Sequence, residues 1–159
     1  MKIHDDKSID HTDKLLLALL QKNALTSTEQ LGSEVGLSAT AAKRRVNKLR
    51  KMGVITKDVS IVDPDSVGLE IFSLVFVNLE RDRRDIVHNF KKAIEQNARI
   101  ISGFYTTGEA DFVLLVASKS LTDYESFTQD FFWENPNIKN FKTMVVLDKV
   151  KFGFELPIL

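Results

Sequence analysis

Cysteine is absent from the 159-residue chain, which excludes disulfide bonds and thiolate metal sites and fits a reducing compartment. Histidine is scarce: the chain has only His4, His11 and His88, and no pair of titratable groups stands out at a strand end in its second half. No apolar run is long enough to span a bilayer, and the polar N-terminus contains no apolar signal segment. The sequence therefore predicts a cytoplasmic protein with neither a metal site nor a cofactor, and little indicates an enzyme.

Net charge is also zero, but its distribution along the chain is uneven. Residues 1–60 hold 11 Lys/Arg and 7 Asp/Glu, a net of +4, whereas residues 61–159 hold 11 and 15, a net of −4. Apolar residues, at 43%, are too frequent for a disordered protein. A globular protein with a basic front and an acidic back is expected to approach a polyanion with its N-terminal part.

Three short helices are predicted near the N-terminus. The first follows Asp10, a good N-cap. Ser27 and Gln30 match a capping box that opens the second helix, and Gly36 is a natural helix stop. Ser38 caps the third helix only a few residues later, so the second and third helices have the spacing of a helix-turn-helix.

The third helix has two distinct faces. Ala42, Val46 and Leu49 recur at helical spacing and form its expected core face. In a helix-turn-helix, the N-terminal part of the second helix meets the base edges of DNA. The residues expected to bind DNA lie on the other face or at the helix starts: Ser27, Ser38, Ala39, Thr40, Lys43, Arg44, Asn47, Lys48 and Lys51.

Different roles are expected within this set. The base-reading candidates are Ser38, Thr40, Lys43 and Arg44, and the phosphate candidates are Lys48 and Lys51. Arg45 lies at the margin of the core face, where a structural ion pair is at least as reasonable as a DNA contact. A solvated basic face on an ordinary helix would also explain the cation run, but the three-helix context and the glycine turn favour DNA binding.

The second half of the chain predicts a different domain. Residues 54–62 alternate loosely and predict a connecting strand, and turn signals place the domain boundary between about 56 and 68, so the proposed domains are 1–60 and 61–159. Strands are predicted at about 69–79, 100–107, 111–117 and 138–150, and helices at about 85–97 and 122–134. This strand–helix–strand–strand–helix–strand order is the ferredoxin-like pattern, and the fold class is α+β.

Both faces of the predicted sheet are apolar. In residues 69–79, Ile71, Val75 and Val77 alternate with another apolar set that includes Phe72 and Phe76. A ferredoxin-like sheet carries helices on one face only, so its other face needs a second cover. Another copy of the chain is the simplest cover and predicts at least a homodimer. Cover by the N-terminal domain is the alternative, although it would restrict access to DNA.

The motifs resemble the Lrp/AsnC, or feast/famine, family of transcriptional regulators. The resemblance spans about residues 9–151. Its N-terminal elements are Ile9-Asp10-x-x-Asp13-x-x-Leu16-Leu17, Val35-Gly36-Leu37-Ser38, Arg45-Val46-x-x-Leu49 and Gly53-Val54-Ile55. Its C-terminal elements are Asp63-Pro64, Gly68, Gly108-x-x-Asp111-Phe112 and Thr143.

This resemblance implies a winged-type helix-turn-helix domain and a ferredoxin-like domain that dimerises and often forms octamers. It also implies a small effector, commonly an amino acid, bound at contacts between dimers. The family's effector region corresponds to Thr107, Gly108, Glu109, Ala110, Asp111 and Thr143. Two residues differ from the usual family pattern: Ala110 stands where an aromatic is frequent, and Phe141 stands where Ser or Thr is frequent. Gly108 and Asp111 are equally well explained as ordinary turn residues.

The leading interpretation is a sequence-specific, effector-responsive transcriptional regulator that binds double-stranded DNA as a homo-oligomer. One alternative is an architectural DNA-binding protein without sequence preference. Another is an enzyme resembling the haem-pathway decarboxylases that share this two-domain form, although the intact basic helix favours DNA. The apolar tail, residues 152–159, is expected to pack on a neighbouring subunit.

Overall fold

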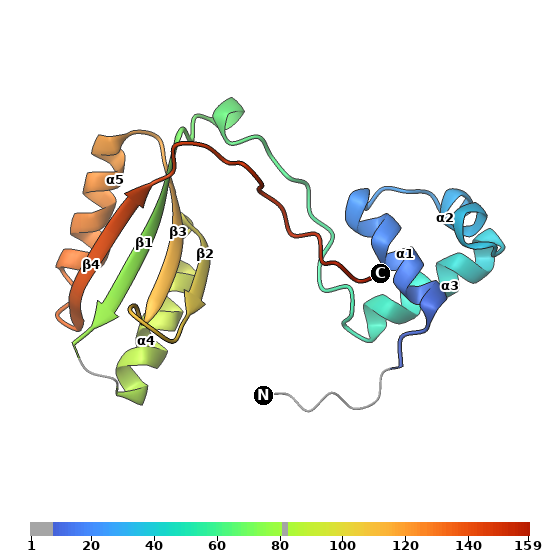
Figure 1. The fold of residues 1–159 in the computed structure, drawn as a ribbon, viewed down its shortest axis with the longest axis horizontal. Coiled ribbons are helices and arrows are strands. Elements are labelled where there is room, and N and C mark those ends of the chain that lie inside the picture. Colours follow the sequence, from blue (N-terminus) through green and yellow to red (C-terminus); the bar gives the residue numbers. More distant parts are fainter. Residues whose placement is uncertain (1–7, 81–82) are drawn as a thin grey trace. The chain divides into compact units, whose positions relative to one another are not determined.

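The computed structural model describes residues 8–80 and 83–159 and divides the chain into two compact units. The helix-turn-helix unit contains the chain up to Ile61 together with Lys151–Leu159, and the sheet unit contains Val62–Val150 (Figure 1). His4 lies outside the described residues. Within the described part, no helix is both long and apolar enough to cross a membrane.

Three helices form the helix-turn-helix unit, as the capping signals predict. They are α1 (His11–Lys22), α2 (Thr28–Val35) and α3 (Ala39–Lys51). Each begins at an N-cap whose side chain accepts a backbone hydrogen bond: Asp10 from Asp13 N at 2.8 Å, Ser27 from Gln30 N at 3.2 Å and Ser38 from Ala41 N at 3.2 Å. These bonds satisfy amides that a helix start leaves unpaired. The positions predicted for the core face of α3 are all buried.

The predicted connecting strand is wrong. Residues 56–62 form no strand in the structure, and Val59, Ile61 and Val62 are 66%, 74% and 60% exposed. A strand persists only where a neighbouring strand pairs with its backbone N–H and C=O groups. None of the backbone hydrogen bonds between described residues involves this segment, so its apolar alternation alone does not make it a strand.

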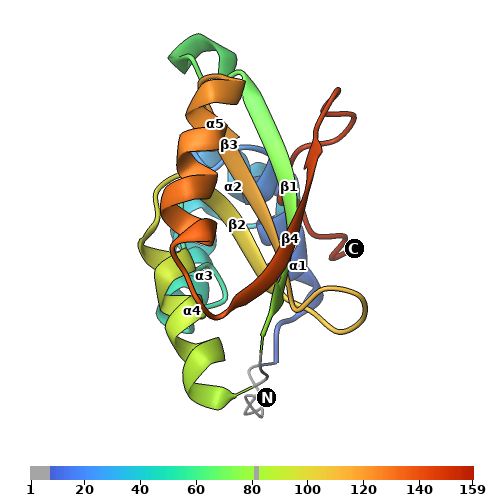
Figure 2. The same cartoon turned by 90° about the vertical axis from the view of Figure 1, so that its left-hand side faces the viewer.

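The sheet unit has the predicted ferredoxin-like order. Its elements are β1 (Ile71–Leu79), α4 (Arg84–Gln96), β2 (Ile100–Tyr105), β3 (Phe112–Ser118), α5 (Leu121–Thr128) and β4 (Ile138–Val145). The strand order across the sheet is β2-β3-β1-β4, and every neighbouring pair is antiparallel. Both helices lie on one side of the sheet (Figure 2).

Several predicted boundaries in the sheet unit differ from the structure, and three of them have a visible cause. β1 begins at Ile71 because a short 3₁₀ turn, Asp65–Val67, and a left-handed Gly68 precede it. β4 ends at Val145, which pairs with Ser73, because β1 provides few partners beyond that point. The second helix is not regular to its end: after Thr128 it continues as a π-helix, Gln129–Trp133. Strand and helix ends depend on their neighbours as well as on local sequence.

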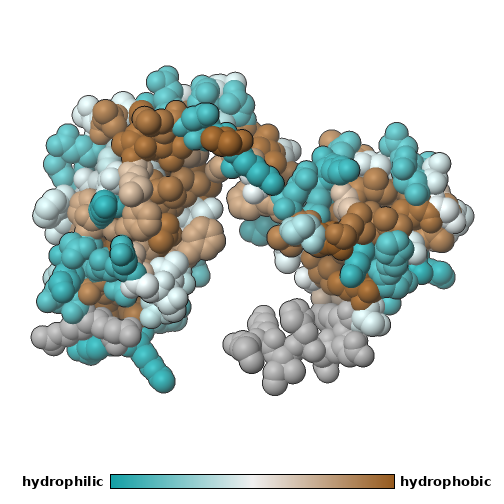
Figure 3. Space-filling model, viewed as in Figure 1, coloured by the Kyte–Doolittle hydropathy of each residue, from teal (hydrophilic) through white to brown (hydrophobic). Residues whose placement is uncertain are grey.

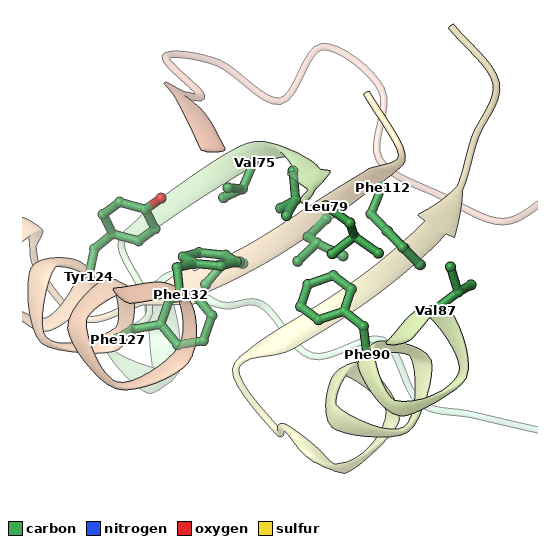
Figure 4. Packing of buried hydrophobic residues seen from close by; sticks show 11 residues of the cluster. Val75, Leu79, Val87, Phe90, Phe112, Tyr124, Phe127 and Phe132 are labelled. Carbon is green, nitrogen blue, oxygen red and sulfur yellow. The ribbon is translucent and has the colours of Figure 1, made fainter. Parts of the chain in front are cut away.

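The core of the sheet unit lies between the sheet and its two helices. Val75 and Val77 of β1 are fully buried, as are Leu114 and Val116 of β3. Aromatic side chains from both helices project onto these strands (Figure 4). Those labelled in Figure 4 are Phe90 of α4, Tyr124 and Phe127 of α5, and Phe132 of the π-helix. Burial of these large rings adds apolar stabilisation to that of the aliphatic strand residues.

The opposite side of the sheet, here called the open face, is also apolar. Its central side chains are half-buried: Leu74 and Phe76 of β1, and Val113 and Leu115 of β3. Towards its margins, Phe104 of β2 is 59% exposed and Met144 of β4 is 46% exposed. Hydrophobic side chains gather over the sheet in the space-filling view (Figure 3). The predicted apolarity of both faces is therefore confirmed.

Candidate nucleic-acid interface and effector region

The outer face of α3 is basic and accessible. Thr40, Lys43, Arg44, Asn47, Lys48 and Lys51 are all exposed, whereas Ala42, Val46 and Leu49 on the inner face are buried. No Asp or Glu interrupts the α3 sequence. The helix therefore presents positive charge and hydrogen-bond donors outward from a buried apolar support, which is the arrangement suited to contact with a nucleic acid.

The remaining predicted DNA-contact residues lie at helix starts. Ser27 and Ser38 are exposed, but each hydroxyl already accepts the backbone hydrogen bond that caps its helix. A serine hydroxyl can still donate its proton while it accepts, so both hydroxyls remain available as hydrogen-bond donors. Ala39, the first residue of α3, is half-buried. The structure thus brings the nine predicted residues together on α3 and at the two caps.

Arg45 is a structural residue of the unit. Its Nη1 donates to Asp10 Oδ2 at 2.5 Å and to Asp13 Oδ1 at 2.9 Å, joining α3 to the start of α1. The backbone bond from Asp13 and the Arg45 guanidinium lower the pKa of Asp10, and the two carboxylates raise the pKa of Arg45. Asp13 is buried and also accepts the Asp10 N–H, so the pair is part of a capping box. The ion-pair interpretation of Arg45 is confirmed.

A shallow cavity of about 310 Å³ opens beside this ion pair. Arg44, Arg45 and Lys48 line it together with Asp10. Arg45 is already paired with Asp10 and Asp13, so the positive charge left beside the cavity comes from Arg44 and Lys48, and it favours an anion such as a phosphate oxygen.

Sequence reasoning missed Gly32, which determines the tightness of the turn. Gly32 is buried in α2, and its carbonyl accepts the Leu37 N–H at 2.8 Å. A Cβ built on Gly32 would lie 2.5 Å from the Leu37 carbonyl oxygen and 3.2 Å from Ala39 N. Backbone atoms cannot move aside as a flexible side chain can, so only glycine fits there. A glycine inside a short helix was the available signal.

The candidate effector turn between β2 and β3 is tightly organised. Gly108 has φ 119°, and Thr107, Gly108 and Glu109 are exposed, whereas Ala110 is buried. The Thr106 hydroxyl donates to the Ala110 carbonyl at 2.6 Å. Asp111 Oδ2 accepts the Leu79 N–H at 2.8 Å, so this carboxylate holds the turn against the end of β1. Asp111 therefore has at least a structural role.

Thr143 is not brought to this turn within one chain. It lies on the edge strand β4, and the order of the sheet places β1 between β4 and β3. Its hydroxyl is 2.5 Å from the Tyr124 hydroxyl of α5. Burial raises the pKa of Tyr124, so the phenol is protonated near neutral pH and can donate or accept. The predicted effector set is thus divided in the single chain.

Phe141, which differs from the usual family pattern, is a core residue here. Its ring stacks on Phe132 with centroids 4.6 Å apart and meets Trp133 edge-on at 5.6 Å. The aromatic at this position packs under the π-helix and leaves no hydroxyl for a ligand. A polar residue there would lose these contacts.

The described residues contain little that suggests catalysis. His11 and His88 are both exposed, on α1 and α4. Within residues 8–80 and 83–159, no three His, Cys, Asp or Glu side chains converge as a metal site would require.

Two family models match the chain, one over its N-terminal helices and one over its sheet. An AsnC-type helix-turn-helix domain matches residues 9–50, and an Lrp/AsnC ligand binding domain matches residues 73–156. Together these matches cover α1, α2 and nearly all of α3, and the sheet from Ser73 onward.

Known proteins agree with this assignment along nearly the whole chain. An uncharacterized HTH-type transcriptional regulator of Sinorhizobium fredii is 49% identical over 150 residues, which cover 94% of this chain and 89% of that protein. The transcriptional regulator AzlB of Bacillus subtilis is 31% identical over 150 residues, covering 94% and 96%. The fold is similar to that of a Neisseria meningitidis transcriptional regulator solved as its L-Met complex, with a TM-score of 0.89, 24% identity and coverage of 95% and 97%.

An AsnC family transcriptional regulator of Agrobacterium tumefaciens has the same fold, with a TM-score of 0.89, 23% identity and coverage of 94% and 97%. The family models, the relatives and the basic outer face of α3 lead to one assignment. This chain belongs to the Lrp/AsnC family and is a DNA-binding transcriptional regulator whose C-terminal ligand-binding domain makes it responsive to a small effector.

Proposed function

We propose that this regulator recognises specific DNA sequences by inserting α3 into the major groove. The observation that carries the proposal is the outer face of α3, which is exposed, basic and free of acids above a buried apolar face. The start of the helix meets base edges, so Ser38, Thr40, Lys43 and Arg44 read bases. Lys48 and Lys51 lie further along and contact phosphates, and Ser27, Ala39 and Asn47 complete the interface.

Two copies act together in this proposal, paired through the open face of the sheet. Six apolar side chains of that face remain exposed or half-buried in a single chain: Leu74, Phe76, Phe104, Val113, Leu115 and Met144. Exposed apolar patches of this kind mark association surfaces, and twofold pairing covers both copies at once. The two α3 helices then address half-sites about 34–36 Å apart, or a multiple of that distance.

An amino acid is the proposed effector, bound around the turn of residues 107–111. The ligand-binding family model covers this turn, and the similar Neisseria regulator was solved with L-Met. Thr143 is separated from the turn in one chain, so a site that uses both needs residues from more than one subunit. Binding there is coupled to subunit assembly, and assembly sets the spacing of the DNA-binding units.

Selection of bound genomic fragments tests this function. The purified protein is incubated with sheared DNA, and the recovered fragments are sequenced. A shared motif with twofold symmetry is the expected result. Uniform recovery of all fragments would instead show an architectural DNA-binding protein. Phosphate contacts are strongest at low salt, so a protein that binds no duplex even near 50 mM salt would rule out DNA recognition by α3.

Replacing Arg44 with Ala is expected to weaken binding to the selected motif by about 1–3 kcal/mol and to relax preference at one base position. Arg44 is exposed near the start of α3, where its guanidinium can pair with guanine. Fluorescence anisotropy on motif variants measures both effects.

Lys51→Ala is the matched control for Arg44→Ala, because Lys51 is exposed at the end of the same helix. Loss of one phosphate contact weakens all sequences alike and reduces the slope of log K against log salt by about 0.9. If Arg44→Ala behaves in this same uniform way, Arg44 is a phosphate contact and does not read a base.

One amino acid is expected to raise the melting temperature in a thermal-shift screen. A ligand that binds only the folded state at 100 times its Kd stabilises by about 2.7 kcal/mol. Thr107→Val, in the exposed turn, should abolish the shift, while Thr122→Val, exposed on α5, should preserve it. An equal shift in both variants would place the effector away from the turn.

A further inference from the structure

The chain passes between its two units twice. Residues Val62–Val150 form the sheet unit, and Lys151–Leu159 then join the helix-turn-helix unit at the other end of the sequence. These last nine residues, here called the C-terminal segment, are therefore covalently attached to one unit and folded with the other. The first connection is the linker that leads from the helix-turn-helix unit, which ends at Ile61, to the sheet unit, which begins at Val62. The C-terminal segment is the second connection.

Gln21 of α1 anchors the C-terminal segment. The Leu156 N–H donates to Gln21 Oε1 at 2.7 Å, and Gln21 Nε2 donates to the Leu156 carbonyl at 3.1 Å. The side-chain amide thus binds both backbone groups of one residue, as a neighbouring strand would. Ile158, two residues later, is half-buried. The C-terminus lies beside α1 in Figure 1.

Glutamine is well suited to this contact. Its amide carries both a donor and an acceptor in a fixed geometry, whereas Glu, Lys and Met lack one or both. Because the bonds go to the backbone, they specify where the segment docks without depending on the Leu156 side chain. Chain termini are usually poorly ordered unless they are tied down, and ordering them costs conformational entropy that two hydrogen bonds repay only in part.

We propose that the C-terminal segment is a second tether that positions the helix-turn-helix unit, with Gln21 as its positioning residue. The proposal rests on paired DNA binding, as set out above. A unit held by one flexible linker samples many orientations, whereas a second attachment removes most of them. In a pair of chains, this raises the effective concentration of the second α3 at one half-site spacing and lowers it at others. The tether therefore determines how strongly the paired chains discriminate between DNA half-site spacings.

Three variants test the tether. Gln21→Met removes both hydrogen bonds while keeping an unbranched helix-forming side chain, and truncation after Val150 removes the segment. Gln96→Met is the matched control, because Gln96 is an exposed helix residue whose side chain makes no hydrogen bond in the described part of the chain. Hydrogen exchange at the Leu156 amide is measured first. Protection is expected in the full-length protein and in Gln96→Met, and its loss is expected in Gln21→Met.

Binding is then measured on duplexes whose half-sites are moved apart by about half a helical turn, roughly 5 bp. The full-length protein and Gln96→Met should discriminate between spacings by at least roughly tenfold, and Gln21→Met and the truncated chain by no more than about threefold, because they lose orientation and keep both α3 helices. Light scattering should give the same number of subunits for all four proteins.

Several results would overturn the tether. One is an unprotected Leu156 amide in the full-length protein, and another is full spacing discrimination in both Gln21→Met and the truncated chain. A third is a change in the number of subunits in Gln21→Met, because the segment would then act in assembly. Absence of spacing discrimination in the full-length protein would also exclude it. A protected Leu156 amide together with no duplex binding by any of the proteins would instead contradict the DNA-binding function, and the proposed consequence of the tether for spacing with it.

Discussion

Leu115→Asp is expected to convert the protein into single chains of 18.0 kDa and to weaken binding to a two-half-site duplex by at least about 100-fold. Leu115 lies on β3, one of the two inner strands, and pairs with Leu74 of β1 across the open face. A carboxylate there must lose its water when two open faces meet, and no opposite charge on the central strands compensates for it. Light scattering and anisotropy measure the two effects.

Leu121→Asp is the matched control for this substitution. Leu121 is 60% exposed and is the first residue of α5, where an acid is favourable at the positive end of the helix. Its mass and DNA affinity should remain unchanged. Phe104→Asp, on the 59% exposed edge of the open face, checks that Leu115→Asp acts through association and leaves the fold intact. An unchanged mass in both open-face variants would show that the chains pair elsewhere.

Gly32→Ala is expected to destabilise the helix-turn-helix unit by about 1–3 kcal/mol, the usual cost of overpacking a close contact. The new Cβ would lie 2.5 Å from the Leu37 carbonyl oxygen, so α2 and the start of α3 must separate. Because that separation moves the caps and the first turn of α3, specific DNA binding should be lost even where the unit remains folded. Urea unfolding and anisotropy report the two effects.

The sign of the stability change in Gly32→Ala shows whether the close contact at Gly32 is required. In an ordinary helix, replacing Gly with Ala stabilises by roughly 0.5–1 kcal/mol. Ser33→Ala, one residue away on the exposed side of α2, should behave in the ordinary way and leave DNA binding intact. If Gly32→Ala stabilised the protein as well, the close approach at the turn would not be a requirement of this fold.

Short-range signals predicted the helix-turn-helix unit well. Asp10, Ser27 and Ser38 act as caps because a side-chain oxygen within a few residues of an unpaired amide is sufficient, whatever the rest of the chain does. The core and outer faces of α3 followed from helical periodicity in the same way. The close approach at Gly32 was harder to predict from the sequence, because it depends on the distance between α2 and the backbone of Leu37 and Ala39.

Long-range features were harder to predict. Residues 54–62 alternate like a strand, but no strand within residues 8–80 and 83–159 pairs with them. β4 is shorter than its apolar sequence suggests because β1 provides few partners beyond Ser73. The tail's packing on a neighbouring subunit stays a prediction, and the sequence did not indicate that Gln21 of its own α1 binds Leu156, 135 residues away. Nothing in the local sequence of either segment specifies that contact.

The sequence by itself determined the fold class, the caps, the basic face of α3 and the apolarity of both sheet faces, because these depend on residue type and spacing over one or two turns or strands. Only the tertiary structure decided that Arg45 is bound by Asp10 and Asp13, that Thr143 is held by Tyr124 away from the effector turn, and that the C-terminal segment returns to α1. Each of these depends on which distant atoms come within hydrogen-bonding distance, and that is a property of the packed chain.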